Sequence, residues 1–329
     1  MRQPRALMSD ADAVRALVNH RYFQPHRTPI QIFNRATDPF LPRVKTHLFD
    51  VLDDLDRRGL TNHVLVVTRY RIDPEDCARL NRLRHLKLTL LVTYSGIADQ
   101  RIEPVDSAIA ARSLQVAYQH AQRYRVVLYW RPLVPRLNDS PEHLARAVEL
   151  SRHAHATVFT GLFYRGEIAD YYRANGLPEP YDHTARRKIV PETLERRVLE
   201  AFDSATGGPL FRKTSCGVSF AHGVPDCNGH YGVRELCDIC PLSQLGLCAD
   251  AHRPPTEAQV RELAARLPDK EDLEIVQISE RAATTAGLDE QPRYFLQHGL
   301  GFQIHDQRHP HRRRRHGRAD IGWQREATA

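Results

Sequence analysis

The chain has 329 residues and a formal net charge of +7, with 41% hydrophobic and 26% charged residues. This composition supports a sizeable buried core and excludes disordered and collagen-like classes for most of the chain. The longest apolar runs, such as 64–67 and 126–130, are far shorter than the roughly 18 to 20 residues of a membrane-spanning helix, and residues 1–10 lack the apolar core of a secretory signal. We therefore expect a cytoplasmic protein that does not enter a membrane.

Much of the net charge lies at the C-terminus. Residues 301–329 contain seven arginines against Asp306, Asp320 and Glu326, which accounts for +4 of the +7. The run of Arg312, Arg313, Arg314 and Arg315 suits weak contact with nucleic-acid phosphates, although a short basic run is equally typical of a solvated tail. The rest of the chain is nearly neutral, so its charge indicates no particular partner.

Short β-branched runs alternate with amphipathic stretches in the first half of the chain, which is the pattern of parallel strands joined by crossover helices. The predicted strands are 29–34, 63–69, 86–95, 124–132 and 156–163. The predicted helices between them are 42–58, 73–84, 104–122 and 140–153. Because runs such as 64–67 are apolar at every position, we expect strands buried on both faces, as in an α/β barrel or a doubly wound sheet.

The pattern changes after residue 165. We expect helices at 165–175, 191–202 and 256–266, a strand-like segment at 209–215 and a strand at 273–279. The last of these strands is expected to complete the ordered part. Beyond His305 the sequence is poor in apolar residues and rich in charge, which predicts a poorly ordered tail.

Polar side chains follow the ends of several predicted strands. In parallel α/β folds the C-terminal edge of the sheet binds ligands, so we expect the site there. Residues 34–40 form a dense polar turn after the first predicted strand, although Asp38 before Pro39 also suits a turn that caps the following helix. Arg131 ends a strand before a long loop, a position that favours anion binding over a surface ion pair.

Five of the six cysteines fall between residues 216 and 248. Cys237 and Cys240 are separated by two residues and can turn onto one metal, and Cys248 can close the site from another direction. Either Cys216 or Cys227 supplies the fourth ligand. Cys216 follows the strand-like residues 213–215, whereas Cys227 lies among turn residues that leave the backbone freer, so we expect Cys216 to bind and Cys227 to be dispensable. Spacing alone does not separate zinc from iron–sulfur.

Other polar residues lie inside the same cysteine-rich segment. They are Asp226, His230, Tyr231, Arg234 and Glu235. These residues could line a substrate cavity or cap the backbone of the loop, and the sequence does not decide between the two roles.

The segments that match a known family are FNRATDPFLP (33–42), VVTR (66–69), LLVTYSG (90–96), YWRPLVPRLND (129–139), SCGVSF (215–220) and CDICPLSQLGLC (237–248). In this order they resemble the spore photoproduct lyase-like branch of the radical S-adenosylmethionine (radical SAM) superfamily. The resemblance implies a partial parallel (β/α)6 barrel that holds a [4Fe-4S] cluster and SAM at the strand C-termini. It also implies an electron donor and a 5′-deoxyadenosyl radical that abstracts hydrogen from an unknown substrate.

The resemblance assigns SAM contacts residue by residue. Asn34, Thr37 and Asp38 match the turn that meets the amino group of the methionine moiety. Ser95 matches a polar residue near the ribose or carboxylate, and Arg131 matches a residue that faces the carboxylate. No catalytic residue and no substrate is implied.

One family feature is missing, because no cysteine precedes Cys77 and the CxxxCxxC cluster loop is therefore absent. Residues 1–20 are similar to the end of the first crossover helix, so we expect an α/β fold with a partial (β/α)6 barrel lacking its first strand and a C-terminal cysteine-rich cluster-binding extension. The expected domains are 1–205 for the barrel, 206–280 for the auxiliary-cluster region and 281–329 for the basic tail segment.

Three further expectations follow from the missing loop. The chain as recorded is expected to be inactive, and its reading frame is expected to continue upstream to the cluster motif. The strand at 29–34 becomes an unprotected edge that tends to pair with other chains. The alternative from another class is a non-catalytic zinc-ribbon protein whose basic tail binds nucleic acid.

Overall fold

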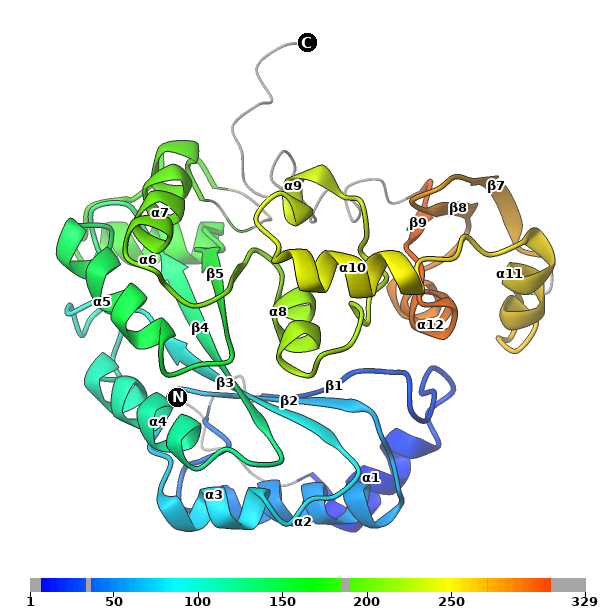
Figure 1. Cartoon of the computed structure of the whole chain (residues 1–329), viewed down its shortest axis with the longest axis horizontal. Helices are drawn as coiled ribbons and strands as arrows, with labels where there is room; N and C mark the ends of the chain where they lie inside the picture. The colour runs from blue at the N-terminus through cyan, green and yellow to red at the C-terminus, as the bar shows by residue number, and fades with distance from the viewer. Residues whose placement is uncertain (1–6, 34–36, 185–187, 189, 271, 309–329) are drawn as a thin grey trace.

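The computed structural model describes residues 7–33, 37–184, 188, 190–270 and 272–308. Six parallel strands form its main sheet and lie in chain order, each beside the next (Figure 1). They are β1 (Ile30–Ile32), β2 (His63–Thr68), β3 (Lys87–Tyr94), β4 (Arg125–Leu133), β5 (Ala156–Gly161) and β6 (Leu210–Phe211). The α/β class and the five strands predicted for the first half of the chain are confirmed.

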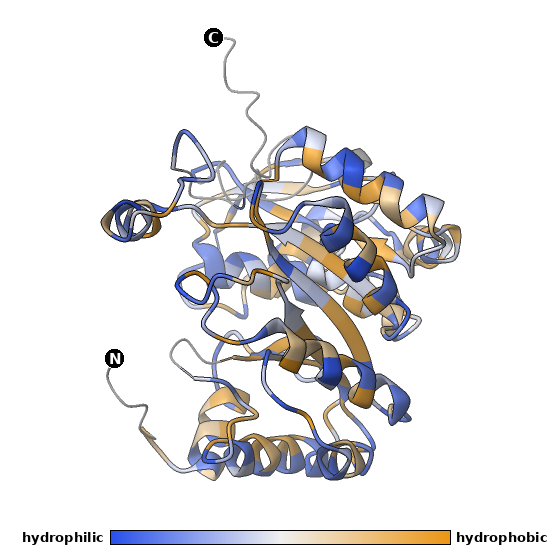
Figure 2. Ribbon diagram, turned by 90° about the vertical axis from the view of Figure 1, so that its left-hand side faces the viewer, coloured by the Kyte–Doolittle hydropathy of each residue, from blue (hydrophilic) through white to orange (hydrophobic). Residues whose placement is uncertain are grey.

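Helices cover the outer face of this sheet (Figures 1 and 2). The helices before β6 are α1 (Asp10–Val18), α2 (Lys45–Arg57), α3 (Pro74–Leu80), α4 (Ser107–Gln119), α5 (Pro141–Ser151), α6 (Gly166–Ala174) and α7 (Glu192–Ser204). Ser140 caps α5 by accepting a hydrogen bond from the backbone N–H of His143, and Asp73 begins α3 with a capping box. The predicted helix starts at these two positions are confirmed.

The strands are buried on both faces, as their continuous apolar sequence predicts. Val126 and Leu128 of β4 pack in the large core under the outer helices, whereas Val127 and Tyr129 pack in a smaller core on the inner face. Successive side chains of a strand point to opposite faces, so one apolar run supplies both cores.

A helix rather than a long strand follows β6 and covers the inner face. α8 (Thr214–Ala221) packs its buried Val218 against Leu91 and Val158 of the sheet. Gly217 permits this contact, since a Cβ there would lie 2.6 Å from Val158 Cγ2. The predicted strand 209–215 is therefore wrong in its second half, and Cys216 lies in the first turn of a helix.

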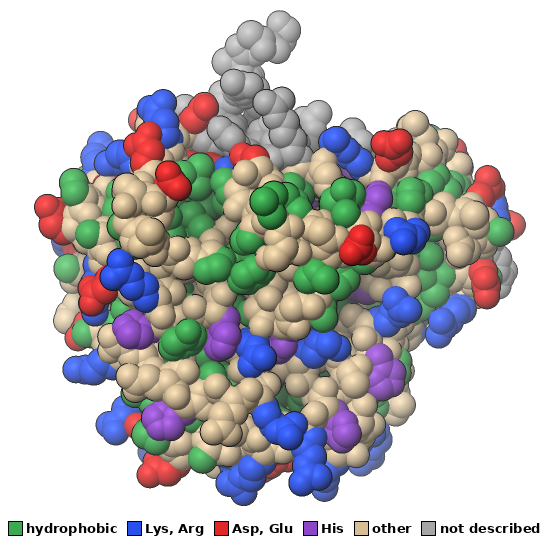
Figure 3. Space-filling view, viewed as in Figure 1, with side chains coloured by type: hydrophobic (Ala, Val, Ile, Leu, Met, Phe, Trp, Pro, Cys, Tyr) green, Lys and Arg blue, Asp and Glu red, His purple; other side chains and the backbone are tan. Residues whose placement is uncertain are grey.

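The cysteine-rich segment continues with two helices that the sequence did not indicate. α9 (Arg234–Cys237) is a single turn, and α10 (Leu242–Ala251) follows it. Hydrophobic side chains gather on the surface over these two helices (Figure 3). Leu242 of α10 is 85% exposed.

A smaller C-terminal lobe has its own sheet and core. Its elements are α11 (Glu257–Ala264), β7 (Glu274–Ile278), β8 (Ala283–Ala286), α12 (Glu290–Leu300) and β9 (Ile304–Asp306). The core joins Val260, Phe295 and Phe302. The expectation that order ends at residue 279 is wrong, because β8 pairs with β7 and with β9. Short strands and a polar helix of this kind leave a weak sequence pattern.

Residues that precede β1 contact this lobe. The side chain of Gln24, which precedes β1, donates a buried hydrogen bond of 2.6 Å to the carbonyl of Phe295 in α12. β1 forms one edge of the main sheet, as expected, and Phe33 beside it is 53% exposed. No helix in the described ranges is long and apolar enough to cross a membrane.

Candidate functional site

A cavity of about 670 Å³ lies on the inner face of the main sheet. Its wall combines residues 17–31, the strand residues Leu65, Tyr129 and Arg131, the start of α8, and α12. The cavity therefore borders the C-terminal end of β4, and its volume is in the range of small-molecule sites.

Three side chains surround the phenol of Tyr129 in this cavity. The guanidinium of Arg131 lies 4.3 Å from the ring centroid and 3.4 Å from the hydroxyl, and the hydroxyl of Thr214 lies 3.3 Å away. Burial by itself raises the pKa of Tyr129, but the positive charges of Lys188 and Arg131 outweigh it and lower the pKa below its usual value. This wall is therefore an electropositive environment.

The cavity suits an anionic group. Arg131 and Lys188 contribute positive charge, and no Asp or Glu is found among the described residues that line it. A guanidinium can bind a carboxylate through two parallel hydrogen bonds. The structure thus places Arg131 where the sequence predicted an anion-binding role.

The other predicted SAM contacts that the structure describes do not line this cavity. Asp38 accepts hydrogen bonds from the hydroxyl of Thr68 at 2.6 Å and from the backbone N–H groups of Phe40 and Arg69 at 2.9 and 2.8 Å. Both carboxylate oxygens therefore brace the fold. The Asx-type turn of the alternative is present in the bond to Phe40, but Asp38 does not cap α2, whose N-cap is Val44. Contact between Asp38 and SAM stays a prediction.

The remaining residues of this set are Ser95, Thr37 and Asn34. Ser95 is buried and accepts a hydrogen bond from the backbone N–H of Ile97. Thr37 is half-buried, and neither it nor Ser95 lines the cavity. Asn34 lies outside the described residues.

The structure brings the predicted cysteine ligands into one region. Cys216 is in α8, Cys237 ends α9, Cys240 follows it and Cys248 is buried in α10. Burial raises the pKa of each of the four thiols, and neighbouring thiols raise it further at Cys216, Cys237 and Cys240. For Cys240 the pKa rises to about 12. A bound cation would stabilise the thiolates in such surroundings.

These thiols are not arranged as a single-ion site. Zinc bonds of about 2.3 Å to tetrahedral thiolates place the sulfur atoms roughly 3.8 Å apart. Throughout the described chain, no three cysteine sulfurs lie within 4.8 Å of one another. A four-iron cluster spreads its ligands farther apart than one ion does, so the four-thiolate cluster stays a prediction.

Arg212 anchors the turn that contains Cys237 and Cys240. It follows β6, is buried, and forms ion pairs with Glu195 of α7 and with Asp238, which lies between Cys237 and Cys240. The CDIC turn is therefore fixed by side chains of the barrel.

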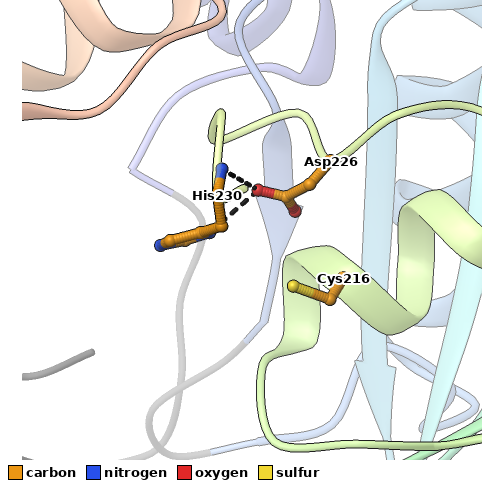
Figure 4. Close-up of side chains that lie close together, drawn as sticks. All are labelled: Cys216, Asp226 and His230. Atoms are coloured by element: carbon orange, nitrogen blue, oxygen red, sulfur yellow. Dashed lines mark hydrogen bonds and ion pairs between the residues drawn. The ribbon is translucent and has the colours of Figure 1, made fainter. Parts of the chain in front are cut away.

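A compact group of candidate ligands joins Cys216 to two residues of the following loop. Cys216, Asp226 and His230 each offer a donor atom, and these atoms lie within 4.8 Å of one another. The carboxylate of Asp226 lies between His230 and the sulfur of Cys216 (Figure 4). Burial raises the pKa of Asp226, but its contacts with His230 outweigh burial and lower it.

The loop that carries Asp226 and Cys227 is held firmly. The N–H of Cys227 donates to the hydroxyl of Ser219 at 3.1 Å, and Asn228 is bonded by His298 at 2.8 Å and by Gln303 at 2.5 Å. The expectation of a freer backbone around Cys227 is therefore wrong. The two bonds to Asn228 come from residues about 70 positions away, which local turn propensity cannot register.

The sequence missed most of the cavity wall. Tyr129 and Lys188 were not singled out, and the aromatic residues Tyr294 and Phe295 belong to an unpredicted helix. The YWR motif gave the signal for Tyr129, because a strand residue two places before Arg131 faces the same side of the sheet.

Comparisons with known proteins give structural similarities only. No protein-family model and no curated protein matches the sequence. A domain of pyruvate-formate lyase-activating enzyme from Bacteroides vulgatus ATCC 8482 is similar, with 13% identity and a TM-score of 0.37 over 55% of this chain and 96% of that chain.

Two structures of SuiB from Streptococcus suis are also similar. The one bound to S-adenosylmethionine has 11% identity and a TM-score of 0.42 over 70% of this chain and 50% of its own. The one bound to the precursor peptide SuiA has 11% identity and a TM-score of 0.43 over 68% and 46%. The chain thus spans about half the length of SuiB.

Proposed function

We propose that this chain binds SAM in the inner-face cavity and is a radical SAM protein. Such an enzyme generates a 5′-deoxyadenosyl radical from SAM and abstracts hydrogen from its substrate. The observation that carries the proposal is Arg131 at the wall of a cavity that borders the C-terminal end of β4. The motifs of the sequence support it, because they follow the ends of β1 to β4 in order.

The chemistry of the wall suits the parts of SAM. Arg131 offers paired donors for the carboxylate, and its stacking on Tyr129 fixes the plane of the guanidinium. Tyr22, Phe23 and Phe295 provide aromatic surface for the adenine. Polar and apolar parts of one ligand would therefore have separate partners.

The metal part of the proposal concerns the cysteine-rich segment. Cys216, Cys237, Cys240 and Cys248 would hold an auxiliary [4Fe-4S] cluster, which supplies electron transfer when bound. The half-buried thiols of Cys216, Cys237 and Cys240, the buried thiol of Cys248 and the fixed CDIC turn support this part. Anaerobic purification followed by iron and sulfide analysis tests it, and a colourless protein with stoichiometric zinc would favour the zinc alternative.

SAM binding is tested by calorimetric titration of the full chain and of Arg131→Gln. A hydrogen bond to a charged group contributes about 1.5 to 3 kcal/mol, so the variant should bind SAM about tenfold to a hundredfold more weakly. Arg123→Gln is the matched control, since Arg123 is exposed just before the same strand. Absence of SAM binding by the parent, or equal affinity of Arg131→Gln, would contradict the proposal.

A further inference from the structure

The compact group of Cys216, Asp226 and His230 has the composition of a metal site. Across the described residues it is the one set of at least three His, Cys, Asp or Glu side chains whose possible ligand atoms all lie within 4.8 Å of one another. The donors are a sulfur, a carboxylate oxygen and an imidazole nitrogen. All three types bind zinc in proteins, whereas the hard cations calcium and magnesium take oxygen ligands.

We propose that Cys216, Asp226 and His230 bind a single divalent transition-metal ion, for which zinc is the best match. Zinc bonds of about 2.0 to 2.3 Å place neighbouring ligand atoms roughly 3.3 to 3.8 Å apart. The donor atoms, which lie within 4.8 Å of one another, therefore need to approach by about 1.5 Å at most, a change that side-chain rotation can supply. This site does not depend on SAM, but it takes Cys216 away from the proposed cluster, which would then keep the three thiolates of Cys237, Cys240 and Cys248.

One oxygen of Asp226 lacks a partner. Oδ2 accepts hydrogen bonds from the N–H of Asn228 at 3.2 Å and from the N–H and Nδ1 of His230 at 2.9 and 2.8 Å. Oδ1 makes no hydrogen bond of normal geometry among the described residues, although the hydroxyl of Ser215 lies near the carboxylate and the Asp226 side chain is only 1% exposed. An unpaired buried carboxylate oxygen is costly, and a cation would remove that cost.

The loop backbone is prepared for this geometry. Gly229 has a φ of +69°, and a Cβ there would lie 2.5 Å from the carbonyl oxygen of Gly301, so the loop packs tightly on the C-terminal lobe. An ion among the three groups exchanges the Nδ1 hydrogen bond for bonds to the metal. The backbone N–H groups of Asn228 and His230 still hold Asp226 in place. The ion therefore does not have to order this ligand itself.

The site would adjoin the cavity. Ser215, next to Cys216, and Cys227 and Asn228, next to Asp226, line the cavity wall. Three protein ligands leave the fourth tetrahedral position of zinc open to water or a bound molecule. The assignment also separates Cys216 from Cys237, Cys240 and Cys248, which the four-thiolate prediction places together.

Cobalt(II) titration of the chelator-treated full chain tests the site, because cobalt replaces zinc and gives a thiolate charge-transfer band. We expect one equivalent to bind. Cys216→Ser should abolish the band, and Asp226→Asn and His230→Gln should weaken binding at least about tenfold. Cys227→Ser is the control and should keep the band, Cys237→Ser distinguishes this site from the thiolate set, and circular dichroism verifies that each variant folds.

Two results would overturn the assignment. One is that the parent binds no stoichiometric cobalt. The other is that Asp226→Asn and His230→Gln bind cobalt as tightly as the parent while Cys237→Ser loses the band, which would assign the ion to the thiolate set. If Cys216→Ser fails to fold, the cobalt affinities of Asp226→Asn and His230→Gln still decide whether the ion binds at this site. SAM titration of the same parent protein reports separately on the proposed function.

Discussion

The main sheet and the cysteine-rich segment are held together by different forces. In the sheet each strand pairs with its neighbour in the sequence, and apolar side chains fill both faces. The segment between residues 216 and 248 packs α8 on the sheet but is also held by polar contacts with residues outside it, among them Arg212 with Asp238 and Gln303 with Asn228. A hydrophobic pattern therefore determines the first region, whereas the second also needs polar contacts that this pattern does not register.

The largest expected effect tests the apolar side of this contrast. Trp130 is 1% exposed and stacks on Phe202 of α7 at 6.0 Å between ring centroids. Trp130→Ala should lower the free energy of unfolding by about 3 to 5 kcal/mol, because a large cavity remains. Urea unfolding measures the change. Leu242→Ala on the exposed surface of α10 should change it by less than about 0.5 kcal/mol, and equal effects would refute the contrast.

A second substitution tests how tightly the cysteine-rich segment is packed. Gly229→Ala combines left-handed strain with overlap against Gly301, so we expect a loss of about 2 to 4 kcal/mol. Gly223→Ala has a similar φ of +63° but open space around its Cβ, so it should cost only about 1 kcal/mol. Equal losses in urea unfolding would mean that the close approach to Gly301 contributes nothing.

The smallest effect concerns a histidine at the start of β2. Burial, with help from the charge of Lys87, lowers the pKa of His63 from 6.5 to about 4. Between these values the unfolded chain takes up a proton that the folded chain refuses, so stability falls as the pH falls, by up to about 1.4 kcal/mol per pH unit. His63→Gln should reduce this slope in urea unfolding across that range, whereas the buried His222 and His298, whose pKa values are lowered to about 3 and about 4, keep their contributions. The exposed His85→Gln should retain the slope; if His63→Gln retains it too, His63 is not responsible.

Much of the fold could be predicted from local sequence. Apolar runs such as 64–67 gave the strands, and Ser140 before Pro141 gave a helix start. The C-terminal lobe could not be predicted, because β8 and β9 are short and become strands only by pairing with each other and with β7.

The candidate site was predicted in part. The local apolar pattern placed Arg131 at the end of a strand, and in the structure Arg131 borders the cavity. The partners of Asp226 and Cys216 could not be derived, because they depend on how α8 and the loop pack in three dimensions. A spacing of cysteines indicates metal binding but does not reveal which carboxylate or imidazole the fold brings beside them.

The hydrogen bond from Gln24 to Phe295 joins residues 271 positions apart. The cavity wall uses residues from both sides of this junction, including Phe23 and Tyr294. During synthesis the six strands can therefore assemble before the cavity closes, since α12 leaves the ribosome after all of them. Ligand capture consequently requires a chain that includes α12, and a ribosome stalled before residue 290 should carry a folded sheet without a closed pocket.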